Sequence, residues 1–159
     1  MIRYFCKIGY NNCMVTGLPF WTLLLLILVF SLWLSLCDIK SLQLPLWGIL
    51  TAGLTLLAAR IIFHKWDSLY YLLSSAILTS IYFIIKFITK NKLGSGDLLF
   101  GIFQGLGFRP QYIWICLAVE TVTGLIYFLI IRDNKKKPFI PFMASGLLLS
   151  FLADCFAAF

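Results

Sequence analysis

Long apolar segments separated by short polar ones form the dominant pattern along this 159-residue chain. The first segment, residues 18–37, carries no charged residue. A helix of that length crosses a hydrocarbon core about 30 Å thick. A proline at position 45 disfavours helix at the preceding residue, so a second helix is expected to start there. The pattern predicts an all-α integral membrane protein, a bundle of six transmembrane helices at residues 18–37, 45–63, 69–87, 98–108, 112–131 and 139–157.

The segment at residues 98–108 is exceptional, because eleven residues of helix cover about 16 Å, roughly half of the hydrocarbon core. It either crosses with one end sunken or dips in and returns. If it crosses, the loops on one side hold eight Lys or Arg and the other side holds five. The positive-inside rule then places the eight in the cytoplasm and both chain termini outside. We expect the crossing, because otherwise the basic cluster at residues 132–137 would face outward.

The composition excludes a soluble domain, because such a fold needs a polar surface. Hydrophobic residues make up 62% of the chain and charged residues 12%, against about 45–50% and roughly 25% in soluble domains. The net charge of +7 fits basic loops held against an anionic cytoplasmic leaflet, so we expect a lipid bilayer and no nucleic acid as partner. We predict a short extracytoplasmic tail at residues 1–17 and one membrane domain at residues 18–159, in the cytoplasmic (inner) membrane.

Charged side chains are costly inside a membrane, so their positions are informative. Asp67 and Asp133 fall in predicted loops, and Asp154 lies near the outer end of the last span, where an interfacial role suffices. Glu120 lies within the fifth span and either takes part in chemistry or hydrogen-bonds to a neighbouring helix. Arg60 lies near the end of the second span, and we expect its side chain to extend outward to the interface.

Asp38 and Asp97 are the remaining acidic residues, and the predicted topology places both at the cytoplasmic face. Asp38 follows the first span directly, and Asp97 ends the sequence Gly94-Ser95-Gly96-Asp97 before the short segment. The near end of a half-length helix lies below the membrane surface. Irregular backbone at that depth must line a wet cavity or pack on protein, and the two glycines allow close packing.

Two carboxyl groups that share a cavity have a known chemical use, since both cannot ionise readily at close range. The ionised carboxylate takes a proton from a water molecule that attacks a carbonyl carbon. The protonated one polarises the carbonyl oxygen and then helps to protonate the leaving amine. This chemistry needs no metal and no cofactor. The alternative is that each aspartate lies at the end of a helix in the membrane interface and has no chemical role.

Three short motifs beside the predicted cytoplasmic loops resemble those of one protein family. Residues 38–45 (DIKSLQLP) are similar to the Asp-x6-Pro element of type IV prepilin peptidases and archaeal preflagellin peptidases. Residues 94–97 (GSGD) resemble their Gly-x-Gly-Asp element, and residues 138–142 (PFIPF) resemble the Pro-Phe-x-Pro-Phe start of their final helix. The motifs occur in the family's order, and six spans match as well.

The resemblance implies a membrane aspartic endopeptidase with Asp38 and Asp97 as the catalytic pair. Its substrates would be precursors of pilins, pseudopilins or archaellin-like proteins, cut on the cytoplasmic side after a Gly that ends a short basic leader. It implies no metal or cofactor. The residues that would support the site by shaping its backbone are Pro45, Gly94, Gly96, Pro138 and Pro141.

Two positions depart from the family pattern. Leu46 stands where Asn or Asp commonly follows the Pro, and Leu99 stands where Lys commonly follows the second Asp by two residues. The domain with paired Cys-x-x-Cys motifs of the long members has no counterpart in the sequence, so we expect cleavage without N-methylation. Two other interpretations remain: a non-catalytic membrane assembly or transporter subunit, and another Gly-x-Gly-Asp protease, of the presenilin or signal-peptide-peptidase type.

Overall fold

The structure is a computed structural model that describes residues 18–41, 44–63, 67–90, 94–130 and 138–157. The tail predicted at residues 1–17, Asp133 and the basic loop at residues 132–137 lie outside the described residues.

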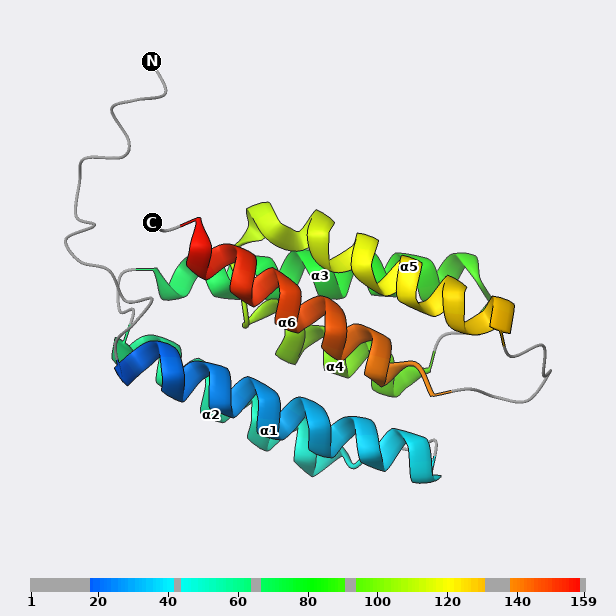
Figure 1. The fold of residues 1–159 in the computed structure, drawn as a ribbon, viewed down its shortest axis with the longest axis horizontal. Coiled ribbons are helices and arrows are strands. Elements are labelled where there is room, and N and C mark those ends of the chain that lie inside the picture. Colours follow the sequence, from blue (N-terminus) through cyan, green and yellow to red (C-terminus); the bar gives the residue numbers. More distant parts are fainter. Residues whose placement is uncertain (1–17, 42–43, 64–66, 91–93, 131–137, 158–159) are drawn as a thin grey trace, which may run out of the picture.

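The described residues form helices and no strand, which confirms the predicted all-α class. Consecutive helices run in opposite directions, so the chain passes back and forth between two ends of one bundle (Figure 1). The helices, including one short 3-10 helix (η2), are α1 (Leu18–Ser41), α2 (Leu46–Phe63), α3 (Ser68–Ile88), α4 (Ser95–Gly105), η2 (Pro110–Tyr112), α5 (Ile113–Ile130) and α6 (Ile140–Phe156).

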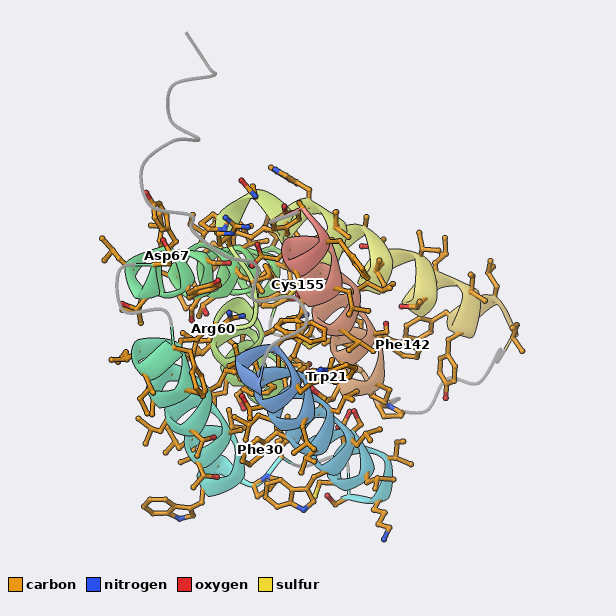
Figure 2. The ribbon with its side chains drawn as sticks, turned by 60° about the vertical axis from the view of Figure 1, so that its left-hand side comes forward. Trp21, Phe30, Arg60, Asp67, Phe142 and Cys155 are labelled. Carbon is orange, nitrogen blue, oxygen red and sulfur yellow. The ribbon has the colours of Figure 1, made fainter. Side chains whose placement is uncertain are left out.

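Four stretches of the described residues are long and apolar enough to cross a membrane: Phe20–Ser41, Leu46–Phe63, Ser68–Ile88 and Pro110–Ile130. Helix α6, with 17 residues, and helix α4, with 11, are shorter. Large apolar side chains cover the outward faces of the bundle (Figure 2), and Trp21, for example, is 59% exposed. Such a surface is suited to hydrocarbon, so the fold is that of a multi-pass membrane protein.

Helix α4 lies inside the bundle, packed against α2, α3 and α6. Its Phe100 and Phe103 side chains are fully buried. Gly105 makes the close approach to α3 possible, because a Cβ atom there would lie 2.3 Å from the Cα atom of Ser75. The Ser75 hydroxyl donates to the carbonyl oxygen of Ile102 at 2.9 Å, which adds a polar link between the two helices.

The bounds of two helices, α1 and α4, differ from the prediction by more than one residue, and both changes affect the aspartates. Helix α1 continues to Ser41, so Asp38 lies inside its last turns rather than after it. The apolar pattern ends at Cys37, but a helix can continue into polar residues once it leaves the hydrocarbon. Helix α4 covers 95–105 rather than 98–108, because Asp97 Oδ2 accepts the backbone N–H of Gly94 at 3.0 Å and caps the first turn.

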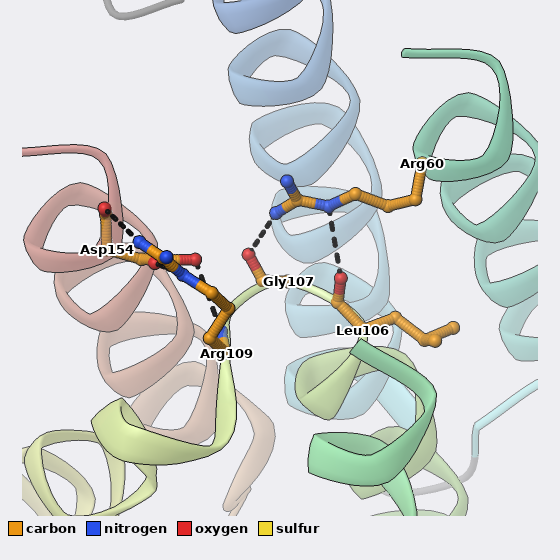
Figure 3. A network of polar contacts seen from close by, with 5 residues as sticks. All are labelled: Arg60, Leu106, Gly107, Arg109 and Asp154. Atoms are coloured by element: carbon orange, nitrogen blue, oxygen red, sulfur yellow. Dashed lines mark hydrogen bonds and ion pairs between the residues drawn. The ribbon is translucent and has the colours of Figure 1, made fainter. Parts of the chain in front are cut away.

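The predicted outward orientation of Arg60 is wrong. Its side chain is 2% exposed and points into the bundle (Figure 2). The guanidinium donates to the carbonyl oxygens of Leu106, at 3.3 Å, and Gly107 (Figure 3), and it stacks on the ring of Tyr71. The last carbonyls of a helix lack intrahelical donors and carry partial negative charge. Arg60 thus supplies hydrogen-bond donors to the carbonyl oxygens that follow α4, which explains how this helix can stop inside the bundle.

Candidate functional site

Asp38 lies at the end of the bundle where α1 finishes and α2, α4 and α6 begin (Figure 1), which we call the aspartate end. The residue is 7% exposed. Its Oδ2 atom accepts the backbone N–H of Ile140 at 3.1 Å. Ile140 is the first residue of α6, and the N–H groups of a first helical turn have no intrahelical acceptor. Asp38 therefore fixes the start of α6 against the last turns of α1.

Asp97 lies in the first turn of α4, at the same end of the bundle and outside the four candidate spans. Burial raises the pKa of this carboxyl group from 3.8 to about 6. The hydrogen bond from Gly94 lowers the pKa, the negative charge of Asp38 raises it, and the charge of Lys86 lowers it more weakly. The two carboxyl groups lie at the same end of the bundle, near enough for the charge of Asp38 to act on Asp97.

Each aspartate uses Oδ2 to accept a backbone N–H, and neither Oδ1 atom is hydrogen-bonded within the described ranges. In this part of the chain, the buried side-chain oxygens without a partner belong to Ser31, Ser74 and Thr79. The Oδ1 atoms of Asp38 and Asp97 are not among them, so both reach the protein surface. Each carboxyl group therefore has one oxygen that makes no hydrogen bond to the described residues.

The two glycines before Asp97 allow close contacts that a larger side chain would prevent. A Cβ atom on Gly96 would lie 2.6 Å from the Cδ1 atom of Leu44, so glycine lets α4 begin against the residue that precedes Pro45. A Cβ atom on Gly94 would lie 3.0 Å from Asp97 Oδ2. The segment with the first aspartate and the segment with the second are thus in direct contact.

The three prolines singled out in the sequence lie at the starts of helices at the aspartate end. Pro45 precedes α2, and its carbonyl oxygen accepts the N–H of Gly48 at 2.9 Å. Pro141 occupies the first turn of α6, where its missing N–H costs nothing. Pro138 lies two residues before α6. All three motif segments therefore meet at one end of the bundle.

A second polar cluster, which sequence reasoning found only in part, lies among α3, α4, α5 and α6. Glu120 accepts a hydrogen bond from the Gln104 side chain and lies 2.6 Å from the hydroxyl of Tyr82. Of the two alternatives left open for Glu120, the structure shows the hydrogen bonds to neighbouring helices. Gln104 was missed, although it is a polar residue in an otherwise apolar segment, which was the available signal.

A third cluster lies at the opposite end of the bundle, which we call the arginine end (Figure 3). Arg109 Nε lies 2.5 Å from Asp154 Oδ1, and its backbone N–H donates to Oδ2 of the same residue at 3.2 Å. Asp154 lies near the end of α6 and is 4% exposed, whereas the side chain of Arg109 is 21% exposed, so the ion pair is partly buried. Within the described ranges, no group of three or more His, Cys, Asp or Glu side chains is arranged to hold a metal ion.

Comparison of the chain with protein-family models, with curated proteins and with solved structures finds no match. The assignment to the prepilin peptidase family stays a prediction that depends on the three motifs.

Proposed function

We propose that the chain is an aspartic endopeptidase that removes the short basic leader of type IV prepilin-like proteins, with Asp38 and Asp97 as the catalytic pair. The observation that carries this proposal is the meeting of three sequence motifs, separated by up to 102 positions, at one end of the bundle. Each aspartate there keeps one carboxyl oxygen free of hydrogen bonds to the described residues.

The electrostatics favour a division of roles between the two aspartates. Burial and the charge of Asp38 raise the pKa of Asp97, so Asp97 is the residue that holds a proton and polarises the scissile carbonyl oxygen. Asp38 takes the proton from the water molecule that attacks the carbonyl carbon. Asp97 then passes its proton to the leaving amine, and the peptide bond breaks.

The proposed position in the membrane uses all six helices. Their alternating directions support six crossings (Figure 1), with α4 as an inner helix whose aspartate end is sunken. The aspartate end then faces the cytoplasm and both chain termini lie outside the cytoplasmic membrane. The exposed Lys40 and the partly buried Lys86 lie near this end, in agreement with the positive-inside rule.

Reconstitution with candidate substrates tests the proposal. The purified chain in lipid nanodiscs is incubated with a prepilin, a pseudopilin and an archaellin-like precursor, and the products are identified by mass spectrometry. We expect one cut after the Gly that ends the leader, in at least one substrate, and no cut with the Asp38→Asn, Asp97→Asn double variant.

Other results of the same experiment would support the remaining interpretations. A cut inside the apolar segment of the substrate would indicate a protease of the presenilin or signal-peptide-peptidase type. A folded wild-type chain that cuts none of the three precursors would contradict the proposal and favour a non-catalytic membrane subunit.

A further inference from the structure

The buried cluster in the middle of the bundle joins four helices through side chains that the proposed reaction does not use. Tyr82 comes from α3, Gln104 from α4 and Glu120 from α5, and they are 3%, 0% and 3% exposed. The carbonyl oxygen of Met143 in α6 completes the cluster, at 2.8 Å from Gln104 Nε2. At such a buried site each polar atom needs a hydrogen-bond partner from the protein, because water does not supply missing donors.

The orientation of the Gln104 amide follows from its contact with Met143. A backbone carbonyl oxygen only accepts hydrogen bonds, so the amide nitrogen and not the amide oxygen must face it. The same nitrogen faces Oε1 of Glu120 and lies 2.9 Å from the sulfur of Cys116. The thiol of Cys116 donates to the same Oε1 atom at 3.1 Å. The amide oxygen of Gln104 is then the atom that lies 2.9 Å from the hydroxyl of Tyr82.

The hydroxyl of Tyr82 has one hydrogen but two oxygen neighbours. The Gln104 oxygen has no hydrogen to give, so Tyr82 must donate to it. Between the Tyr82 hydroxyl and Glu120 Oε2, which are 2.6 Å apart, the hydrogen must therefore come from Glu120. A proton on Oε1 instead would point at the N–H of Gln104, which also needs an acceptor.

We infer that Glu120 carries a proton on Oε2 and is a neutral positioning residue that closes a ring of three hydrogen bonds. Glu120 donates to Tyr82, Tyr82 donates to Gln104, and Gln104 donates to Glu120. An ionised Glu120 would leave two oxygens facing each other at 2.9 Å without a hydrogen between them. It would also be a buried charge that forms no ion pair with any described Lys or Arg.

The ring fixes the depth of α4 in the bundle. Gln104 lies seven residues after Asp97, so both lie on the same face of the short helix, two turns apart. A helix of 11 residues has few other polar anchors, and Gln104 holds it to α3, α5 and α6 at once. The effect on the position of Asp97 rests on the proposed function, whereas the protonation of Glu120 does not.

Infrared spectroscopy tests the protonation directly. Spectra of the wild-type chain and of Glu120→Gln, both in nanodiscs, are compared at about pH 8, where Asp97 is ionised. We expect a carbonyl stretching band of a protonated carboxylic acid in the wild type and its loss in the variant. A difference spectrum that shows only the bands of an ionised carboxylate would overturn the proposal.

Two substitutions of similar size test the ring. In Glu120→Gln the amide N–H replaces the acid O–H, so the ring stays closed, and we expect a melting temperature within about 3 °C of wild type. In Glu120→Met the ring opens, and we expect a loss of more than about 6 °C. A loss of similar size in both variants would show that the amide does not close the ring and would refute the inference.

Leader cleavage in the same variants tests the positioning role. We expect Glu120→Gln to cleave faster than Glu120→Met, measured at a temperature where both are folded. Equal rates in the two folded variants would refute the positioning role. Absence of cleavage in the wild type would instead refute the proposed function, while the infrared band would still decide whether Glu120 is protonated.

Discussion

The two ends of the bundle treat buried acidic side chains in opposite ways. At the arginine end, Asp154 is paired with Arg109, which supplies both a charged donor and a backbone N–H. At the aspartate end, Asp38 and Asp97 accept one backbone N–H each and form no ion pair with a described basic residue. Both ends hold aspartates in a largely apolar chain, so burial alone does not distinguish them.

The difference fits a structural role at the arginine end and the chemical role that we propose for the aspartate end. The guanidinium and the backbone N–H of Arg109 hold the Asp154 carboxyl group in one geometry, which suits a link between the segment before α5 and the end of α6. At the aspartate end, burial and the negative charge of Asp38 raise the pKa of Asp97. Each carboxyl group there keeps an oxygen free of hydrogen bonds to the described residues, and perturbed acidic groups are typical of reactive sites.

Removing one member of the arginine-end ion pair should cost the most stability. We expect Asp154→Ala to lower the free energy of unfolding by about 3 kcal/mol, because it leaves Arg109 without its charged partner in a partly buried site. Asp38→Asn should cost about 1 kcal/mol, since the amide oxygen can still accept the N–H of Ile140. Thermal unfolding in detergent measures the loss in both variants. Equal losses of unfolding free energy would contradict the proposed difference between the two ends.

A methyl group on Gly105 tests the close approach of α4 to α3, which connects the two ends. The added Cβ would lie 2.3 Å from backbone of α3, so we expect Gly105→Ala to cost about 1–3 kcal/mol. Gly53→Ala in α2 is the matched control, because a Cβ there meets nothing within 4 Å and the alanine favours helix by up to about 1 kcal/mol. A neutral effect at Gly105 would show that α4 packs less closely than described.

The pH dependence of stability should show a smaller effect that belongs to the aspartate end. Asp97 binds its proton more tightly in the folded chain, with a pKa of about 6 against 3.8. Its contribution to stability is therefore complete below the unfolded value and is lost as the pH rises through about 6. We expect Asp97→Asn to remove part of the fall in melting temperature between about pH 4 and 7. An unchanged fall in this variant would contradict the raised pKa.

Hydrophobic patterning was sufficient for the helices and for their order, because an apolar segment in a membrane must satisfy its backbone polar groups internally and therefore forms a helix. It located α1 and α4 but not their ends, since these depend on Asp97 capping Gly94 and on polar residues continuing a helix. Partners that meet only in three dimensions could not be predicted. Arg60 was assigned to the surface because its acceptors, at Leu106 and Gly107, are 46 and 47 positions away.

The sequence was enough to predict two aspartates at one end of the bundle, but it was not enough to predict the geometry of the candidate site. Topology and motifs are enough to select Asp38 and Asp97 from the sequence, and the two residues do lie at one end of the bundle. The hydrogen bond that joins Asp38 to α6 spans 102 positions, and no local pattern encodes it. The role of Gln104 likewise depends on groups from three other helices.

The catalytic pair is tested most directly by leader cleavage in single asparagine variants from both ends of the bundle. Asp38→Asn and Asp97→Asn keep the shape of the side chain but remove the acid, and each should lower the cleavage rate by at least about 100-fold. Asp67→Asn, at the start of α3 and the opposite end of the bundle (Figure 2), should cleave at the wild-type rate. Full leader removal by either of the first two variants would contradict the account.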